Sequence, residues 1–200
     1  TVELSNFWIG EHLVSQNIWE TLTGKNPSFF KGKHFPVEMI SWEIIVNDFL
    51  PKLNRITKRS RPEDTSYHLP LEAQWEYVAR KVYNKNVFIA ESSIGMQIDP
   101  QEKEYKYAGS DKLNDVAWHR GNSHAETKPV GLKLPNEIGI FDMSGNVWEW
   151  CQDWYSNDYY RECKMEGVVK NPPGSVHVGR HSLRGGSTLS YNTDGQNYFP

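Results

Sequence analysis

The stretch GIFDMSGNVWEW, from Gly139 to Trp150, constrains the fold more than any other part of the chain. Trp148 and Trp150 flank Glu149, so on a β-strand both indoles would face one way and the carboxylate the other. We expect both indoles to be buried, since apolar burial stabilises by about 25 cal/mol per Å². The carboxylate would then be free on the opposite face to bind a metal ion or a basic side chain.

Helical spacing and capping residues predict three helices in the first half of the chain, over residues 16–22, 42–53 and 71–80. Pro51 falls inside the second pattern and should kink or end that helix. Short strands are expected at 2–10, 147–153 and 182–187. This pattern indicates one α+β domain over residues 1–200. The tryptophans expected to be mostly buried in it are Trp19, Trp42, Trp75, Trp148 and Trp150.

Composition excludes several classes of protein. The net charge of −3 argues against binding along a nucleic-acid backbone, and no apolar run reaches the roughly 18 residues that a membrane span needs. Cys151 and Cys163, the only cysteines, fit no zinc spacing and are expected to be free, buried thiols. The seven histidines show no metal-binding spacing and are expected to serve as ordinary hydrogen-bonding side chains.

Five blocks of sequence resemble, in order, the formylglycine-generating (sulfatase-modifying factor) domain family. They are FWIGEHLVSQ at 7–16, PVEMISW at 36–42, YHLPLEAQWEYVAR at 67–80, YKYAGS at 105–110, and residues 136–153. The resemblance implies a C-type-lectin-like fold with little regular secondary structure. Family members usually carry a strand ahead of the position of Val2 and a closing Gly-Phe-Arg strand. Neither is in this sequence, so the terminal strands are expected to be either missing from the chain as given or replaced.

The resemblance also implies a calcium site, with a side-chain oxygen of Asp142, the carbonyls of Gly145 and Val147, and the carboxylate of Glu149 as ligands. In the alternative interpretation, Asp142 caps the turn that follows it and Glu149 pairs with an arginine. Enzymes of the family hold copper with two cysteines shortly after the block that matches SLRGGS at 182–187. Residues 188–200 contain no cysteine, which predicts no copper and no enzymatic activity of that kind.

The segment 188–200 is rich in Tyr, Asn, Ser, Thr, Asp, Gly and Gln, a composition typical of recognition surfaces. It resembles the family's non-catalytic branch, the variable proteins of diversity-generating retroelements, which display diversified residues in this region. Trp148, Trp150 and Arg184 would support it from beneath. The residues expected to contact a ligand are Thr188, Ser190, Tyr191, Asn192, Asp194, Gln196, Asn197 and Tyr198.

The sequence therefore predicts a non-enzymatic ligand-binding module that presents a C-terminal recognition surface to a protein or glycan. We expect a monomer at a bacterial cell surface or secreted, anchored by lipid through a leader outside this sequence. Two alternatives stay open. One is a metal-dependent, oxidase-like enzyme of the same family, and the other is a structural subunit of a bacterial envelope complex.

Overall fold

The computed structural model describes residues 2–80, 105–177 and 179–190, and within them helices mix with short strands. The helices are α1 (Gln16–Thr23), α2 (Trp42–Ile44), the π-helix η1 (Ile45–Phe49), α3 (Leu50–Thr57), α4 (Glu72–Arg80), α5 (Leu113–Val116) and α6 (Tyr159–Glu166). The strands are β1 (Val2–Glu3), β2 (Ala117–Trp118), β3 (Ser144–Gly145), β4 (Glu149–Trp154), β5 (Val169–Lys170) and β6 (His181–Arg184). This mixture confirms the predicted α+β class.

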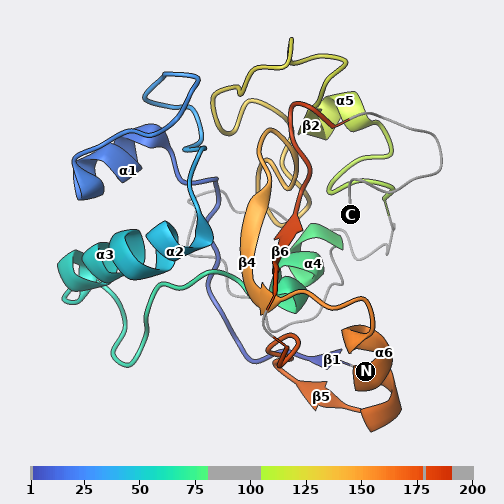
Figure 1. The fold of residues 1–200 in the computed structure, drawn as a ribbon. Helices are drawn as coiled ribbons and strands as arrows, with labels where there is room; N and C mark the ends of the chain where they lie inside the picture. Colours follow the sequence, from blue (N-terminus) through green and yellow to red (C-terminus); the bar gives the residue numbers. More distant parts are fainter. Residues whose placement is uncertain (1, 81–104, 178, 191–200) are drawn as a thin grey trace.

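Strand β4 lies between two groups of helices (Figure 1). On one side, Cys151 of β4 joins a core cluster with Trp75 and Val78 of α4. On the other side, Trp150 packs against a cluster that contains Trp19 of α1 and Phe49 of η1, whose rings stack at 4.6 Å. Successive side chains of a strand point to opposite faces, so neighbouring residues of β4 serve different cores.

The described strands form three two-stranded sheets. Strands β1 and β5 pair in parallel, as do β2 and β3, whereas β4 and β6 are antiparallel and bring Glu149 opposite Arg184. The predicted strands were too long: the first is only Val2–Glu3, the signature strand begins at Glu149, and the last ends at Arg184. Glycine at 185 and 186 takes positive φ angles of 89° and 79°, which ends the β6 ladder there.

The three predicted helices are present, and three of their caps follow the sequence. Ser15 and Ser41 each accept a hydrogen bond from the amide three residues on, and Gly24 ends α1 with φ 76°. Pro51 does not end the helix, which continues to Thr57, but the regular α-helical pattern is interrupted just before it. The π-helical segment immediately before it widens the helix ahead of the proline ring and so accommodates the missing amide hydrogen.

The prediction that five tryptophans are mostly buried holds for four of them and fails for Trp148. Trp19 and Trp75 are 3% and 0% exposed, whereas Trp42 and Trp150 are half-buried and Trp148 is 41% exposed. Trp148 precedes β4 instead of belonging to it. The indole N–H groups of Trp42 and Trp150 donate to the carbonyls of Cys151 and Ile40, at 3.1 and 3.2 Å, so burial of these rings leaves no donor unsatisfied.

Cys151 and Cys163 are free and buried, as predicted. In the part of the chain that the structure describes, no helix is long and apolar enough to cross a membrane.

Candidate functional site

The candidate site lies at the end of the β4–β6 pair where β4 begins and β6 ends. Trp148 lies just before β4 and residues 187–190 follow β6, so the antiparallel pairing places them at the same end. The amide of Gly145 donates to the carbonyl of Gly185 at 2.6 Å. This bond connects the GNVWEW segment (145–150), which leads into β4, to the RGGS turn (184–187) at the end of β6. The two sequence blocks that carry the family resemblance therefore meet in space.

Glu149 is the least satisfied polar group at this junction. Its Oε1 atom is buried and makes no hydrogen bond of ordinary geometry, although the indole N–H of Trp75 is close enough to favour the ionised carboxylate. Burial raises the pKa of Glu149 to about 8, an effect that the Trp75 indole opposes and the Asp142 carboxylate strengthens. A buried carboxylate oxygen without a donor is destabilising unless a proton or a cation occupies it.

Asp142 lies in the same electrostatic neighbourhood and is only 2% exposed. Its Oδ2 accepts from the Gly131 amide at 2.8 Å, and its Oδ1 accepts from Asn146 at 3.4 Å. Burial raises the pKa of Asp142, against the opposing effect of these hydrogen bonds and of His12. Both oxygens of Asp142 therefore already accept hydrogen bonds, whereas one oxygen of Glu149 has only the Trp75 indole as a donor.

The alternative interpretation of these carboxylates does not match their contacts. Asp142 accepts from Gly131 across the fold, outside the turn that it was expected to cap. Arg184 pairs with Glu76 at 2.6 Å and lies 3.9 Å from Glu72, while its guanidinium lies over the Trp75 ring. Among the described residues no group of three His, Cys, Asp or Glu side chains comes together, so a cation here would also need carbonyl ligands.

Asn146 organises the loop around these carboxylates, and the sequence analysis assigned it no role. It is completely buried, and its side chain bonds both the amide and the carbonyl of Lys128, at 3.1 and 3.0 Å. Its backbone carbonyl accepts from Thr188 and its amide donates to Trp118. The Gly-Asn pair within the signature was the available signal, because Asn tolerates the positive φ of 61° found here.

Asp153, farther along β4, is another buried carboxylate, only 1% exposed. Its Oδ2 accepts from the amide of Glu72 at 2.7 Å and so caps α4, but its Oδ1 has no hydrogen-bond partner. Burial raises the pKa of Asp153 to about 6, with the cap opposing and the Glu72 carboxylate adding to the rise. The ionised form is thus less favourable in the folded protein than in the unfolded chain.

Asp153→Asn should therefore change how stability depends on pH. The pKa of Asp153 is near 4 in the unfolded chain and about 6 in the folded protein. The protonated carboxyl therefore adds to the free energy of unfolding below pH 4, and this added stability is lost as the pH rises through about 6. Asn keeps the oxygen that caps α4 but does not titrate. After allowance for solvent screening, we expect the variant's stability relative to wild type to improve by about 1–2 kcal/mol between pH 4 and pH 7. Urea unfolding across this range measures the change, and a constant difference would contradict it.

Only the first residues of the predicted recognition segment are described. Thr188 is 4% exposed, its amide donates to the carbonyl of Asn146, and its carbonyl accepts from the Ser123 hydroxyl. The prediction that Thr188 contacts a ligand is therefore wrong, because its side chain is buried. Ser190 is half-buried, and its carbonyl accepts from the Arg120 amide. The remaining predicted contacts lie outside the described residues: Tyr191, Asn192, Asp194, Gln196, Asn197 and Tyr198.

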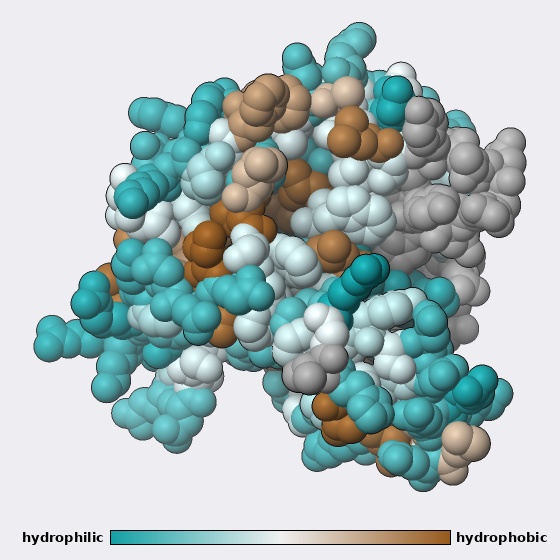
Figure 2. Space-filling view, viewed as in Figure 1, coloured by the Kyte–Doolittle hydropathy of each residue, from teal (hydrophilic) through white to brown (hydrophobic). Residues whose placement is uncertain are grey.

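An exposed apolar surface lies where this segment leaves β6. Trp148, Leu183 and Leu189 are 41%, 40% and 57% exposed. Leu183 pairs with Trp150 across the strands, so its side chain points to the same face, towards the helices α1–α3. Figure 2 shows apolar residues gathered in the middle of this face, between those helices and the β4–β6 pair. Single exposed leucines are common, but an exposed indole and two exposed leucines at one end of the β4–β6 pair offer a contact area for a ligand.

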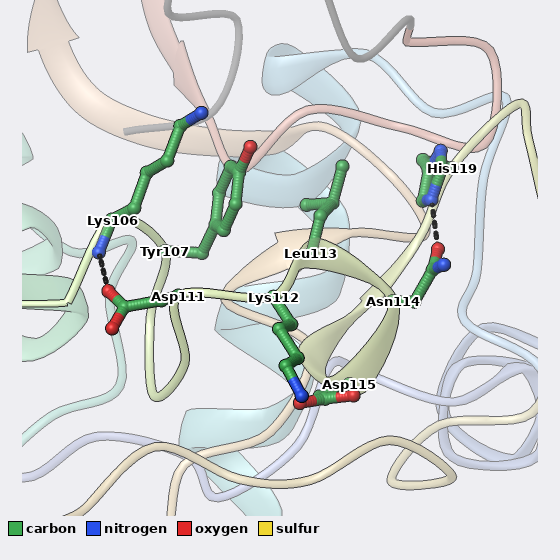
Figure 3. A pocket seen from close by; sticks show the side chains of 8 residues that line it. All are labelled: Lys106, Tyr107, Asp111, Lys112, Leu113, Asn114, Asp115 and His119. Atoms are coloured by element: carbon green, nitrogen blue, oxygen red, sulfur yellow. Dashed lines mark hydrogen bonds between the residues drawn. The ribbon is translucent and has the colours of Figure 1, made fainter.

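A separate pocket of about 470 Å³ beside α5 is less suited to chemistry (Figure 3). His119 lines it, but the Gly121 amide donates to its Nδ1 atom at 3.2 Å, and its Nε2 atom lies 2.7 Å from Asn114 Oδ1. Burial lowers the pKa of His119, assisted by Lys133. Both ring nitrogens are therefore engaged within the fold, as expected for a structural histidine.

Comparison with known proteins agrees with this geometry. The sulfatase-modifying factor enzyme 1-like domain matches residues 1–199. Chaperone protein LppX of Paenibacillus barcinonensis is 31% identical over 78% of the chain and 65% of its own length. The formylglycine-generating enzyme of Streptomyces coelicolor is 29% identical over 88% of the chain and 49% of its own length. The chain thus spans between about half and two thirds of these relatives.

A solved structure, Treponema denticola variable protein 1, superposes with a TM-score of 0.69 at 23% identity. The match covers 90% of this chain and 72% of that one. At this level of identity the likeness shows the fold alone, and it confirms the expected C-type-lectin-like fold.

Proposed function

Because the chain belongs to the sulfatase-modifying factor enzyme 1-like domain family, we propose that it uses this lectin-like scaffold to bind a ligand without catalysis. The observation that carries the proposal is the exposed surface of Trp148, Leu183 and Leu189, at the end of β4–β6 where the polar segment begins. An aromatic platform next to small polar side chains is the usual composition of an adaptable protein- or glycan-binding surface.

The positions of the cysteines support a binding role. Copper-thiolate chemistry needs two sulfurs that converge on one metal ion. Cys151 is on β4 and Cys163 is on α6, at 0% and 5% exposure. Burial and the nearby carboxylates of Glu149, Glu72 and Asp153 raise the pKa of the Cys151 thiol, which disfavours the thiolate. Residues 188–200, where enzymes of the family carry their pair, contain no cysteine.

The same scaffold would hold a structural calcium ion. Glu149 and Asp142 would supply carboxylate oxygens, and the carbonyls of Gly145 and Val147 would complete the protein ligands. The buried Oε1 of Glu149, which makes no hydrogen bond of ordinary geometry, supports this assignment. A cation bound there would hold the GNVWEW segment (145–150) in place next to the exposed surface of Trp148, Leu183 and Leu189.

Alanine at Tyr191, Asn192, Asp194 and Tyr198 should weaken binding by at least about tenfold and change the melting temperature little, since exposed recognition residues affect stability by about 0.5 kcal/mol. The probes are a glycan array and a displayed peptide library, followed by titration of the strongest hit. Tyr155→Ala is the matched control, because Tyr155 is 53% exposed and follows the opposite end of β4. Equal loss in the control, or loss of folding in the four variants, would reject the surface.

The formylglycine-generating relatives make the enzyme the second candidate. Incubation with a cysteine peptide of the sulfatase motif, copper and oxygen should leave the peptide mass unchanged. A mass shift to the formylglycine product would overturn the non-catalytic assignment, whatever the binding assays show. Localisation at the envelope and a monomeric state belong to the same proposal.

A further inference from the structure

Positive charge is concentrated in the segment of the chain that carries α1, α2 and α3. Residues 15–61 contain eight Lys and Arg against four Asp and Glu, a net charge of +4 in a chain whose total is −3. The rest of the chain is therefore strongly acidic. A molecule polarised in this way orients in the field of an anionic surface, with the basic part towards it.

The basic side chains gather on the outer face of α3. Lys52, Arg55 and Arg59 follow at intervals of three and four residues, which places them on one side of the helix and its last turn. Lys52 pairs with Asp48 at 2.7 Å. Within the described part of the chain, the exposed side chains of Arg55, Lys58 and Arg59 form no ion pair or hydrogen bond. Interaction with the helix dipole explains one cation near the C-terminus but does not require this many.

Acidic residues do follow in sequence but do not neutralise this face. Glu63 and Asp64 are exposed in the next loop, and in the part described neither pairs with the α3 cations. The loop itself is fixed to the helix, because Asn54 bonds both the carbonyl and the amide of Tyr67 at 2.8 Å. Apart from Lys52, which pairs with Asp48, the cations of this face are therefore uncompensated.

Apolar side chains border the cations on both edges. Ile56 is 60% exposed, one turn after Lys52. Tyr67 is 48% exposed at the Asn54 edge, with Arg61 at 6.0 Å over its ring. The helix forms an outer edge of the molecule (Figure 1), and Figure 2 shows that edge covered mainly by hydrophilic side chains.

We propose that the α3 face, defined as Lys52, Arg55, Ile56, Lys58, Arg59 and Tyr67, docks on a lipid bilayer that contains anionic phospholipid. The cations would lie among the phosphates, while Ile56 and the Tyr67 ring enter the boundary between headgroups and acyl chains. A membrane fits better than a nucleic acid or an acidic protein, because the exposed isoleucine neither stacks on bases nor forms hydrogen bonds but can enter the apolar boundary of a bilayer. The acidic remainder, with the β4–β6 surface, would be held away from the bilayer.

The test is sedimentation of the whole chain with vesicles of phosphatidylcholine alone or mixed with phosphatidylglycerol. We expect binding only to the mixed vesicles, and release when NaCl rises from about 50 mM to about 500 mM. The triple variant Arg55→Gln, Lys58→Gln, Arg59→Gln should bind about 100-fold more weakly, since each cation near such a surface contributes about fivefold. Ile56→Ser should weaken binding about fivefold at equal charge.

The matched control is Lys164→Gln, Lys170→Gln, Arg180→Gln, which removes the same charge from exposed positions elsewhere. It should bind like wild type, and circular dichroism should show both triple variants folded. Absence of binding to the mixed vesicles, or equal weakening in the two triple variants, would overturn the proposal. Binding to polyglutamate or duplex DNA but not to vesicles would also overturn it, in favour of that polyanion.

Discussion

Gly145→Ala should unfold the protein or destabilise it by about 4 kcal/mol or more, one of the largest effects of any single methyl group in this chain. Gly145 has φ 82°, which L-residues rarely adopt. A Cβ atom there would also overlap the carbonyl oxygen of Trp118 and lie 3.0 Å from two further backbone atoms of that residue. Relief would require β2 and β3 to separate, because the obstacle is backbone and not a mobile side chain.

Gly139→Ala provides the control for backbone strain alone. Gly139 has the same φ of 82°, but a Cβ atom there would have no neighbour within 4 Å. We expect this variant to lose only about 1 kcal/mol, the ordinary cost of a positive φ. Urea unfolding of the two variants separates the steric effect from the conformational one. Similar losses in both would show that the close approach of β2 to β3 is not what requires glycine.

The local signals in the sequence predicted much of this fold. Ser15 and Gly24 mark the ends of α1 because capping depends on neighbouring residues alone. The order of the resembling blocks predicted the class and the lectin-like fold. Strand length was not predictable, because the ends of β4 and β6 depend on pairing between residues about 35 apart, and one of those ends is the double-glycine turn. Helices α5 and α6 were missed, since α5 has only four residues and α6 carries few apolar side chains.

The site was only partly predictable, for a similar reason. The signature identified Glu149 and Asp142, and both lie buried in one electrostatic neighbourhood. The sequence misplaced Trp148, because alternation along a strand gives the wrong exposure for a residue that precedes the strand. It also assigned Thr188 to the surface from its composition, whereas its position is set by Asn146 and Ser123 from distant parts of the chain.

Removal of calcium should lower the melting temperature of the wild-type protein by about 5–10 °C. A ligand present at 100 times its Kd stabilises the native state by about 2.7 kcal/mol, and each kcal/mol shifts the melting temperature of a domain of this size by about 2–4 °C. The measurement is a melting curve at neutral pH in excess calcium and in excess chelator. Identical curves would reject the cation site.

Glu149→Gln should reverse the order of stability between the two conditions. In calcium the variant should be less stable than wild type, because the amide removes a charged ligand from the cation. In chelator it should be at least as stable. Burial raises the pKa of Glu149 to about 8, so near neutral pH the wild-type carboxyl must take up a proton on folding, a cost that the amide does not carry. Glu162→Gln on α6, at an exposed position, removes the same charge and should follow wild type in both conditions. If Glu149→Gln were less stable in chelator as well, Glu149 would be acting through contacts within the protein and not through a cation.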